Sequence, residues 1–347
     1  FPAEAGLKLS VDVIEHIATK IPKWVSLAMS GYHIREAGST AVQEVAFTFA
    51  NAREYLDQAI ARGVSVDFVA PTLFTFLSSN IDFLPEIAKF RAARRVWARL
   101  MREKYDAKDP ASEKLRIFAF TAGSSLTAQQ AMNNVVRTSI EMMAAALGGI
   151  QTMHVSAFDE ALGVPTEEAA TLALRTQQVV AFETGVLDSP DPLAGSFELE
   201  RMTDDLEREI WELLANIEKR GGALECVNNG YFVNEISENS YKLTMAIESG
   251  EKKVVGVNAF QSESAPFKPF EINPKSESEQ VASLKAVRAK RDNKTVTAAL
   301  ENLLTVAKAG ENVVPATVEA IKAYATVGEI VNELRKVYGK WQPTKIF

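Results

Sequence analysis

Four apolar runs, each followed by a stretch with helical spacing, organise the first half of the chain. The runs cover residues 24–29, 69–77, 115–123 and 150–158. A buried parallel strand reads as a near-continuous hydrophobic run with little alternation. Helical spacing follows the runs at residues 41–62, 85–105, 127–147 and 167–183. Four strand–helix units of similar length predict parallel pairing with right-handed crossovers, and therefore an α/β fold.

The rest of the chain is predicted to be mostly helical. A helix is expected before the first run, at residues 8–20, and further helices at 203–220, 225–248, 277–291, 294–308 and 314–338. Residues 254–257 are strand-like, and residues 260–276 carry three prolines, which indicates a linker or a surface arm. Five arginines within 85–105 are expected to form a solvated or interface face.

Composition narrows the class of protein. The 347 residues are 47% hydrophobic, which is typical of a globular protein with a large core, and the net charge of −7 favours neither nucleic acid nor an anionic membrane as partner. No apolar run reaches the roughly 20 residues of a membrane span. The single cysteine, Cys226, excludes an internal disulfide and fits a reducing cytoplasm. Phe1-Pro2 is neither an initiator methionine nor a signal peptide, so we expect the chain to start part-way into a larger protein.

The strongest candidate chemistry follows the first apolar run. That run ends in Ser30-Gly31 and then presents Tyr32 and His33. The loops after the strands form the active face of α/β barrels, although His33 could equally be a structural histidine in a strand–helix turn. The three histidines are scattered and no Cys/His pair has metal-ligand spacing, so no metal site is expected. The chain also lacks a phosphate loop and a nucleophile elbow, which argues against a conventional kinase, dehydrogenase or hydrolase.

Residues 30–38, Ser-Gly-Tyr-His-Ile-Arg-Glu-Ala-Gly, resemble the Ser-Gly-Tyr-His-x-x-Glu-Ala-Gly signature of the adenosylcobalamin-dependent acyl-CoA mutases, the methylmalonyl-CoA mutase family. Other similar stretches lie at residues 86–97, 133–138, 158–166, 191–196 and 255–258. The resemblance implies the second half of a (β/α)₈ TIM barrel followed by a mostly helical C-terminal region. Its implied domains are 1–165, the half-barrel that binds acyl-CoA; 166–259, a helical extension; and 260–347, a linker with helices that contact another subunit. The first four barrel strands would precede Phe1, in the same or a separate chain.

The same resemblance implies an isomerase that rearranges the carbon skeleton of a CoA thioester by radical chemistry. The Asp-x-His-x-x-Gly pattern of the family's cobalamin domain is absent. Adenosylcobalamin would therefore be bound mainly by a small cobalamin-binding subunit, as in split mutases such as the 2-hydroxyisobutyryl-CoA mutases. A chaperone GTPase is the further partner that the family suggests.

The resemblance also implies roles for individual residues. His33 matches the residue that hydrogen-bonds the thioester carbonyl, and Tyr32 would pack beside the substrate and the adenosyl group. Glu160 matches the carboxylate that holds the adenosyl ribose, with Ser156 nearby where the family has Asn; the alternative for Glu160 is an acid favoured by a helix dipole. Lys23 matches a lysine that contacts CoA, and the alternative is an ordinary solvated charge.

Several departures from the family pattern bear on the substrate. Thr72-Leu73-Phe74 replaces Arg-Leu-Ser, Ser124 replaces a Trp, and Phe118 and Phe120 replace a His-x-Gln pair. Strand residues two apart share a face, so both phenylalanines should line the barrel interior, where they make a carboxylated acyl group costly to bury. We therefore expect an apolar acyl group, branched or aromatic. The predicted substrate-binding set is Lys23, Thr72, Phe74, Phe76, Phe118, Phe120 and Ser124.

Two other interpretations remain open from the sequence. The loss of polar residues at 118 and 120 also fits a catalytically degenerate scaffold that binds a cobalamin subunit or a chaperone. An unrelated barrel lyase would require the family similarity to be coincidental.

Overall fold

A computed structural model describes residues 1–263 and 267–342 of the chain. Its sheet contains four parallel strands in the order β1-β2-β3-β4. The strands are β1 (Leu27–Ser30), β2 (Leu73–Ser79), β3 (Ile117–Thr121) and β4 (Thr152–His154). The register places Ser30 beside Phe76, Phe76 beside Phe118, and Phe120 beside His154. The predicted α/β fold with parallel pairing is confirmed.

Helices connect the strands in the expected alternation. They are α2 (Tyr32–Glu36), α3 (Ala41–Ala61), α4 (Val66–Thr72), α5 (Phe83–Arg99) with a π-helical extension (Leu100–Lys104), a 3₁₀ turn (Gly123–Ser125), α6 (Asn133–Leu147) and α7 (Glu167–Glu183). Alternate strand residues such as Leu77, Ile117 and Ala119 are buried on one face of the sheet. On the other face, Phe76 and Phe120 are only half-buried. The sheet therefore has one fully packed face and one open aromatic face.

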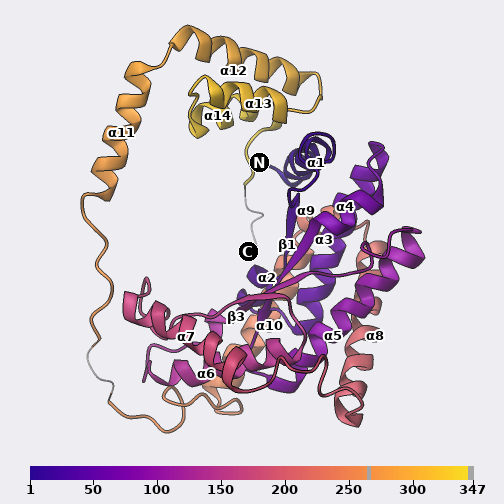
Figure 1. The fold of residues 1–347 in the computed structure, drawn as a ribbon, viewed down its shortest axis with the longest axis vertical. Helices are drawn as coiled ribbons and strands as arrows, with labels where there is room; N and C mark the ends of the chain where they lie inside the picture. The colour runs from indigo at the N-terminus through magenta and orange to yellow at the C-terminus, as the bar shows by residue number, and fades with distance from the viewer. Residues whose placement is uncertain (264–266, 343–347) are drawn as a thin grey trace. The chain divides into compact units, whose positions relative to one another are not determined.

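Helix α8 (Phe197–Lys219) packs along α5, and the two helices run side by side in Figure 1. Ion pairs join them: Arg91 to Glu200 at 2.7 Å, and Arg99 to Glu207 at 2.8 Å. These arginines therefore form an interface face, as expected from the sequence.

Some predicted elements are shorter, divided or absent. Residues 69–72 lie in α4 rather than in a strand, because a short apolar run fits a buried helix as well as a strand. Helix α6 begins at Asn133 rather than at residue 127, since the Asn134 side chain bonds both the N–H and the C=O of Thr127 and holds a turn there. Residues 254–257 form no strand, because the Asn258 side chain closes a turn onto the N–H of Val254 at 2.7 Å.

Two predicted helices each prove to be a pair. Residues 225–248 fall in α9 (Ala223–Asn228) and α10 (Tyr231–Glu248), separated by Gly230 at φ +78°. Residues 314–338 fall in α13 (Val314–Lys322) and α14 (Val327–Tyr338), separated where Tyr324 takes φ +65°. A residue with positive φ cannot continue a right-handed helix, so each pair is interrupted there.

The chain divides into two compact units. The first comprises residues 1–26, 55–65 and 271–347, and the second comprises residues 27–54 and 66–270. The first contains α1 (Ala3–Lys20), α11 (Ser276–Lys290), α12 (Asn293–Lys308), α13 and α14. Within it, the buried Asp12 carboxylate of α1 accepts hydrogen bonds from Arg62 at 2.6 Å and from the N–H of Val313 at 3.1 Å. The three-domain division drawn from the sequence stays a prediction. Across the described residues, the helices are all too short or too polar to cross a membrane.

Candidate functional site

The turn after β1 fixes the two residues with the strongest predicted chemistry. Helix α2 starts at Tyr32, so Tyr32 and His33 follow the strand after a single glycine. The N–H of Gly31 donates to the carbonyl of Phe76 at 2.8 Å. If residue 31 carried a Cβ atom, it would lie 2.4 Å from Thr48 Oγ1, so only glycine allows this close approach. The turn is therefore held against β2 by this hydrogen bond and packs closely against α3.

Tyr32 stacks on the open face of the sheet. Its ring lies parallel to that of Phe76, with 4.8 Å between centroids and 6° between planes, and 4.9 Å from the ring of Phe120. Phe76 also packs against Phe118 at 5.0 Å, and Phe120 against His154 at 4.2 Å. We call Tyr32, His33, Phe76, Phe118, Phe120 and His154 the aromatic cluster.

His33 stands at one side of this cluster with one ring nitrogen engaged. Its ring meets Phe76 edge-on, with 5.8 Å between centroids, and its Nδ1 lies 2.7 Å from Ser30 Oγ. When the Ser30 hydroxyl donates to Nδ1, the neutral ring carries its proton on Nε2. The side chain is exposed, and within the described residues nothing bonds Nε2. His33 can therefore present an N–H donor to a ligand.

Two carboxylates meet the tyrosine hydroxyl around Gly123, on the 3₁₀ turn after β3. A Cβ atom at position 123 would lie 2.6 Å from Glu160 Oε1, 3.3 Å from Glu36 Oε2 and 3.6 Å from the Tyr32 hydroxyl. The backbone N–H of Ser124 donates to Glu36 Oε2 at 2.7 Å, and the Ser124 hydroxyl donates to Oε1 at 3.1 Å. Glycine at 123 thus lets three polar side chains converge, two from α2 and one from the turn after β4.

Burial and mutual repulsion shift the acidities of these groups. Burial raises the pKa of Tyr32, and the neighbouring charges of Glu36 and Glu160 raise it further. Burial likewise raises the pKa of Glu36, against the hydrogen bonds from Ser124. The pKa of Glu160 is raised by burial and lowered by a hydrogen bond with Ser156. Ser156 is itself buried, and both its N–H and its hydroxyl donate to Thr121, at 2.8 Å and 3.1 Å, which fixes it beside the end of β3.

A buried ionic cluster lies behind the Tyr32–His33 turn. Lys89 Nζ donates to Glu44 Oε2 at 2.8 Å, to Glu86 Oε2 at 2.5 Å and to the carbonyl of Ser78 at 2.7 Å, and all three charged side chains are fully buried. Glu44 Oε1 accepts from the N–H of Ser78 at 2.6 Å. Arg35, two residues after His33, brings its guanidinium to 3.6 Å from Glu86. The cluster therefore links α2, α3 and α5 to the end of β2.

The other predicted site residues differ in their environments; they are Thr72, Phe74, Ser124 and Lys23. Thr72 ends α4 and donates to the carbonyl of Val69 at 2.8 Å. Phe74 is half-buried, one pleat below Phe76 and on the same face of β2. Ser124 contacts the centre through its two hydrogen bonds to the Glu36 carboxylate. Lys23 is exposed and belongs to the first compact unit, so its role stays a prediction.

Two residues of the centre were missed from the sequence. Glu36 was visible in the Ser30–Gly38 signature, but nothing there indicated that its carboxylate would reach the turn after β3. His154 alternates with Ser156 on the fourth apolar run, and this period-two spacing could have placed both on the open face.

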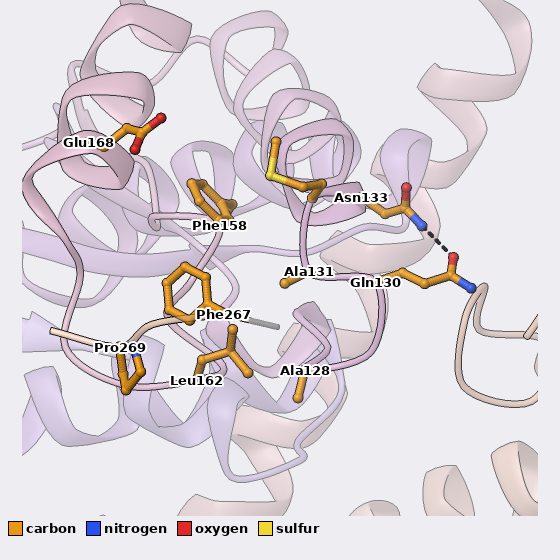
Figure 2. Close-up of a pocket in the computed structure, with 10 residues that line it drawn as sticks. Ala128, Gln130, Ala131, Asn133, Phe158, Leu162, Glu168, Phe267 and Pro269 are labelled. Carbon is orange, nitrogen blue, oxygen red and sulfur yellow. Dashed lines mark hydrogen bonds between the residues drawn. The ribbon is translucent and has the colours of Figure 1, made fainter. Parts of the chain in front are cut away.

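A separate apolar pocket lies beside the turn that carries Glu160. Figure 2 shows Phe158 and Phe267 facing each other across it, with 6.1 Å between ring centroids. Its volume is about 700 Å³, and Leu162 and Pro269 complete the apolar part of the lining. Gln130, which also lines the pocket, donates to the carbonyl of Phe260 at 3.0 Å. This bond holds the start of the proline-containing segment that begins at residue 260. The pocket can take an apolar group, and it is distinct from the aromatic cluster.

Comparison with known proteins places the chain among mutases. The family model described as "Methylmalonyl-CoA mutase" matches residues 1–340. The chain is 41% identical to the "2-hydroxyisobutanoyl-CoA mutase large subunit" of Aquincola tertiaricarbonis, covering 100% of this chain and 62% of that protein. It is 40% identical to the "Methylmalonyl-CoA mutase" of Rhizobium meliloti, over 98% of this chain and 48% of that protein, and 37% identical to the mitochondrial human one, over 98% and 46%. The chain thus spans about half the length of the curated relatives it matches.

Proposed function

The chain belongs to the methylmalonyl-CoA mutase family, and on this premise we propose that it forms part of an acyl-CoA mutase, an isomerase that rearranges the carbon skeleton of a CoA thioester. The observation that carries the proposal is the convergence around Gly123. Tyr32, on the turn after β1, and Glu160, on the loop after β4, both reach this turn after β3. These are the side chains to which the resemblance assigns the substrate and the adenosyl group.

The four parallel strands fit the second half of a (β/α)₈ barrel. In such a barrel, alternate residues of every strand point to an interior filled by side chains. Phe76, Phe118 and Phe120 occupy these alternate positions and are only half-buried on the open face. Four further strands, from the same or a separate chain, would cover them.

His33 is the proposed electrostatic catalyst. An N–H donor aimed at the thioester carbonyl stabilises the charge that develops on oxygen during migration of the acyl carbon skeleton. Ser30 fixes the orientation of the ring, and Phe76 supports it from the side. Tyr32, stacked flat on Phe76, would form the wall beside the reacting carbons and exclude water from them.

The residues present fit the cofactor that the family uses. Adenosylcobalamin, when bound, supplies the radical that removes a substrate hydrogen and later returns it. Glu160 offers carboxylate oxygens as acceptors for ribose hydroxyls, and glycine at 123 leaves the adjacent space free of a side chain. The words "large subunit" in the name of one relative support a small, cobalamin-binding subunit as partner.

The lining favours an apolar acyl group, branched or aromatic. Phenylalanines occupy positions 76, 118 and 120, and the aromatic cluster contains neither Lys nor Arg. Burying a carboxylate against such a surface without a countercharge is costly. A methylmalonyl group would therefore be a poor substrate.

Turnover by the assembled enzyme tests this proposal. The full-length protein, the small subunit and adenosylcobalamin would be assayed with a panel of CoA thioesters. We expect turnover of branched apolar thioesters and weak turnover of methylmalonyl-CoA. Strong activity on methylmalonyl-CoA with none on apolar thioesters would reject the proposed substrate class.

A second candidate is a non-catalytic scaffold that binds a cobalamin subunit or a chaperone. The aromatic pair Phe118 and Phe120 favours it, because both stand at positions where the family pattern has polar residues. Electron paramagnetic resonance separates the two candidates. A radical signal that depends on the thioester supports the mutase, and a silent complex that still binds the small subunit supports the scaffold.

A further inference from the structure

Glu141 of α6 contacts the ends of two neighbouring strands. Its backbone carbonyl accepts a hydrogen bond from the Ser79 hydroxyl at the end of β2, at 2.6 Å. Its carboxyl reaches the 3₁₀ turn after β3, where Ser125 Oγ lies 2.5 Å from Glu141 Oε1. The side chain is fully buried, and among the described residues Oε2 has no hydrogen-bond partner. The mechanism proposed above gives this acid no role.

The Ser125 hydroxyl has one proton and two acceptors within reach. Besides Glu141, its Oγ hydrogen-bonds the carbonyl of Ala122 at 2.8 Å. If Glu141 were ionised, its carboxylate and this carbonyl would compete for the single hydroxyl proton. A neutral Glu141 carries a proton of its own, so its contact with Ser125 persists whichever acceptor the hydroxyl serves. The geometry of the contact therefore favours the neutral acid.

The groups that face Glu141 also oppose its ionisation. Burial raises the pKa of Glu141, and the charges of Glu86 on α5 and Glu36 on α2 raise it further. The charge of Glu141 would in turn raise the pKa of Tyr32 on α2. Arg137, one turn earlier on α6, interacts with this charge, but its guanidinium donates its hydrogen bonds to other groups. Glu141 is therefore neutral at neutral pH.

The turn that contacts this acid, Gly123–Ser125, is the one at which the candidate site converges. Two hydrogen bonds from Ser124, one from its N–H and one from its hydroxyl, go to the Glu36 carboxylate. The glycine of the turn lies against Glu160 and against the Tyr32 hydroxyl. A shift of the turn would therefore change the positions of all three side chains.

We propose that Glu141 is a positioning residue for the reaction, and that in its neutral form it holds the Gly123–Ser125 turn in place through Ser125. The inference rests on the mutase function proposed above and adds a residue that acts through another side chain. Ionisation would weaken this anchor and add a negative charge near Glu36. A displacement of about 1 Å at a reacting centre can lower turnover by about 100-fold. The reaction therefore needs the proton on Glu141, although that proton takes no part in the chemistry.

The test uses the full-length enzyme with its small subunit and four variants. Glu141→Gln keeps the shape, a donor and an acceptor but cannot ionise, and Glu141→Leu removes both donor and acceptor. Ser125→Ala removes the other partner of the contact. Ser139→Ala is the matched control, because it makes the same exchange at a partly buried serine of α6 whose hydroxyl donates within its own helix, to the carbonyl of Val135 at 2.6 Å.

The first readouts are kcat and KM for a branched apolar thioester, measured from neutral to alkaline pH. We expect the kcat of the unmodified enzyme to fall as the pH rises through about 9, where Glu141 loses its proton. Glu141→Gln should keep most of its kcat at neutral pH and lack this fall. Glu141→Leu and Ser125→Ala should lower kcat by about 10- to 100-fold with little change in KM, and Ser139→Ala should match the unmodified enzyme. Equal losses in Glu141→Gln and Glu141→Leu, or full turnover by Ser125→Ala, would overturn the inference.

Two measurements that need no turnover distinguish this inference from the proposed function. Infrared difference spectra between neutral and alkaline pH should show the loss of a neutral carboxyl band, which Glu141→Gln lacks and Ser125→Ala shifts. The dissociation constant for adenosylcobalamin, with the small subunit present, should rise by about 3- to 10-fold in Ser125→Ala and Glu141→Leu. Both results without turnover of any thioester would reject the mutase and support the hold of Glu141 on the turn. Turnover by an enzyme that shows no carboxyl band from Glu141 would support the mutase and reject the role of Glu141.

Discussion

At the scale of residues, the centre depends on two positions that carry no side chain. Glycine at 31 lets the turn after β1 rest on Thr48, and glycine at 123 leaves space where Glu160, Glu36 and the Tyr32 hydroxyl converge. Each glycine is needed for close approach, because a Cβ atom would collide with a neighbouring group. The arrangement of the polar side chains in the site therefore depends on the absence of a Cβ atom at positions 31 and 123.

Gly123→Ala tests this dependence. The new methyl group would lie 2.6 Å from Glu160 Oε1 and must displace that carboxylate. A displacement of about 1 Å at a positioning residue can lower turnover by about 100-fold, while circular dichroism should show an intact fold. Gly6→Ala is the control, since nothing lies within 4 Å of a Cβ atom there. Unchanged turnover in Gly123→Ala would remove Glu160 from the mechanism.

His33→Ala tests the proposed donor to the thioester carbonyl. Loss of one such donor lowers kcat by about 100- to 1000-fold. Because His33 is exposed and its removal leaves only the Ser30 hydroxyl without a partner, we expect little change in thermal stability. Steady-state kinetics and a melting curve check both parts, and full turnover by the variant would contradict the role.

The sequence predicted this centre unevenly. Tyr32, His33 and Glu160 belong to motifs that lie close to the ends of apolar runs, so their approach follows from the parallel sheet. Glu36 was missed because its contact with Ser124 joins two turns whose geometry is set by tertiary packing. His154 was missed because its contact with Phe120 depends on the register between β3 and β4. The alternation of residues along β4 was the only local signal for His154.

At the scale of elements, buried charged side chains join the C-terminal end of β2 to α2, α3 and α5. Lys89 on α5 bonds the carbonyl of Ser78 and the carboxylates of Glu44 and Glu86. Without this ammonium group, the two buried carboxylates would have to share the Arg35 guanidinium, which lies 4.0 Å from Glu44 and 3.6 Å from Glu86. Arg35 of α2 pairs with the same two carboxylates, so these ion pairs also hold α2 in position.

Lys89→Met should therefore be strongly destabilising. Breaking a buried ion pair by removing one partner costs about 3–5 kcal/mol, because the opposite charge stays buried. The matched control is Lys108→Met, whose partner is Asp106 and whose side chain is 72% exposed. That change should alter the free energy of unfolding by less than about 1 kcal/mol. Urea unfolding of both variants gives the comparison, and similar midpoints would contradict the expectation.

Long elements were predicted more accurately from the sequence than short ones. The helices predicted at 41–62 and 167–183 match α3 and α7 to within one residue, because their apolar spacing extends over several turns. Residues 69–77 were divided between α4 and β2, since a short apolar run satisfies both structures. Breaks at Gly230 and Tyr324 depend on single backbone conformations that periodicity does not reveal.

At the scale of the whole molecule, one buried acid should influence the dependence of stability on pH. Glu141 of α6 is fully buried and accepts a hydrogen bond from the Ser125 hydroxyl. Burial raises the pKa of Glu141 from 4.5 to about 9. The folded protein therefore keeps this proton at pH values where the unfolded chain releases it.

Stability contributed by the neutral Glu141 is complete below pH 4.5 and is lost as the pH rises towards 9. The free energy of unfolding should fall in this window by up to about 1.4 kcal/mol per pH unit from this group. Glu141→Gln removes the titrating proton, so its stability should change less with pH. Urea midpoints at acidic, neutral and alkaline pH compare the two proteins, and parallel profiles would exclude this contribution.

The sheet described above also has a consequence for how the protein can be assembled. Among the described strands, β1 and β4 each pair with a single neighbour, so both outer strands keep a row of backbone donors and acceptors available. In the (β/α)₈ barrel proposed above, four further strands, from the same or a separate chain, would pair with both rows at once and close the cylinder. If those strands belong to a separate chain, the two pieces would assemble by fragment complementation, each providing the template for the other.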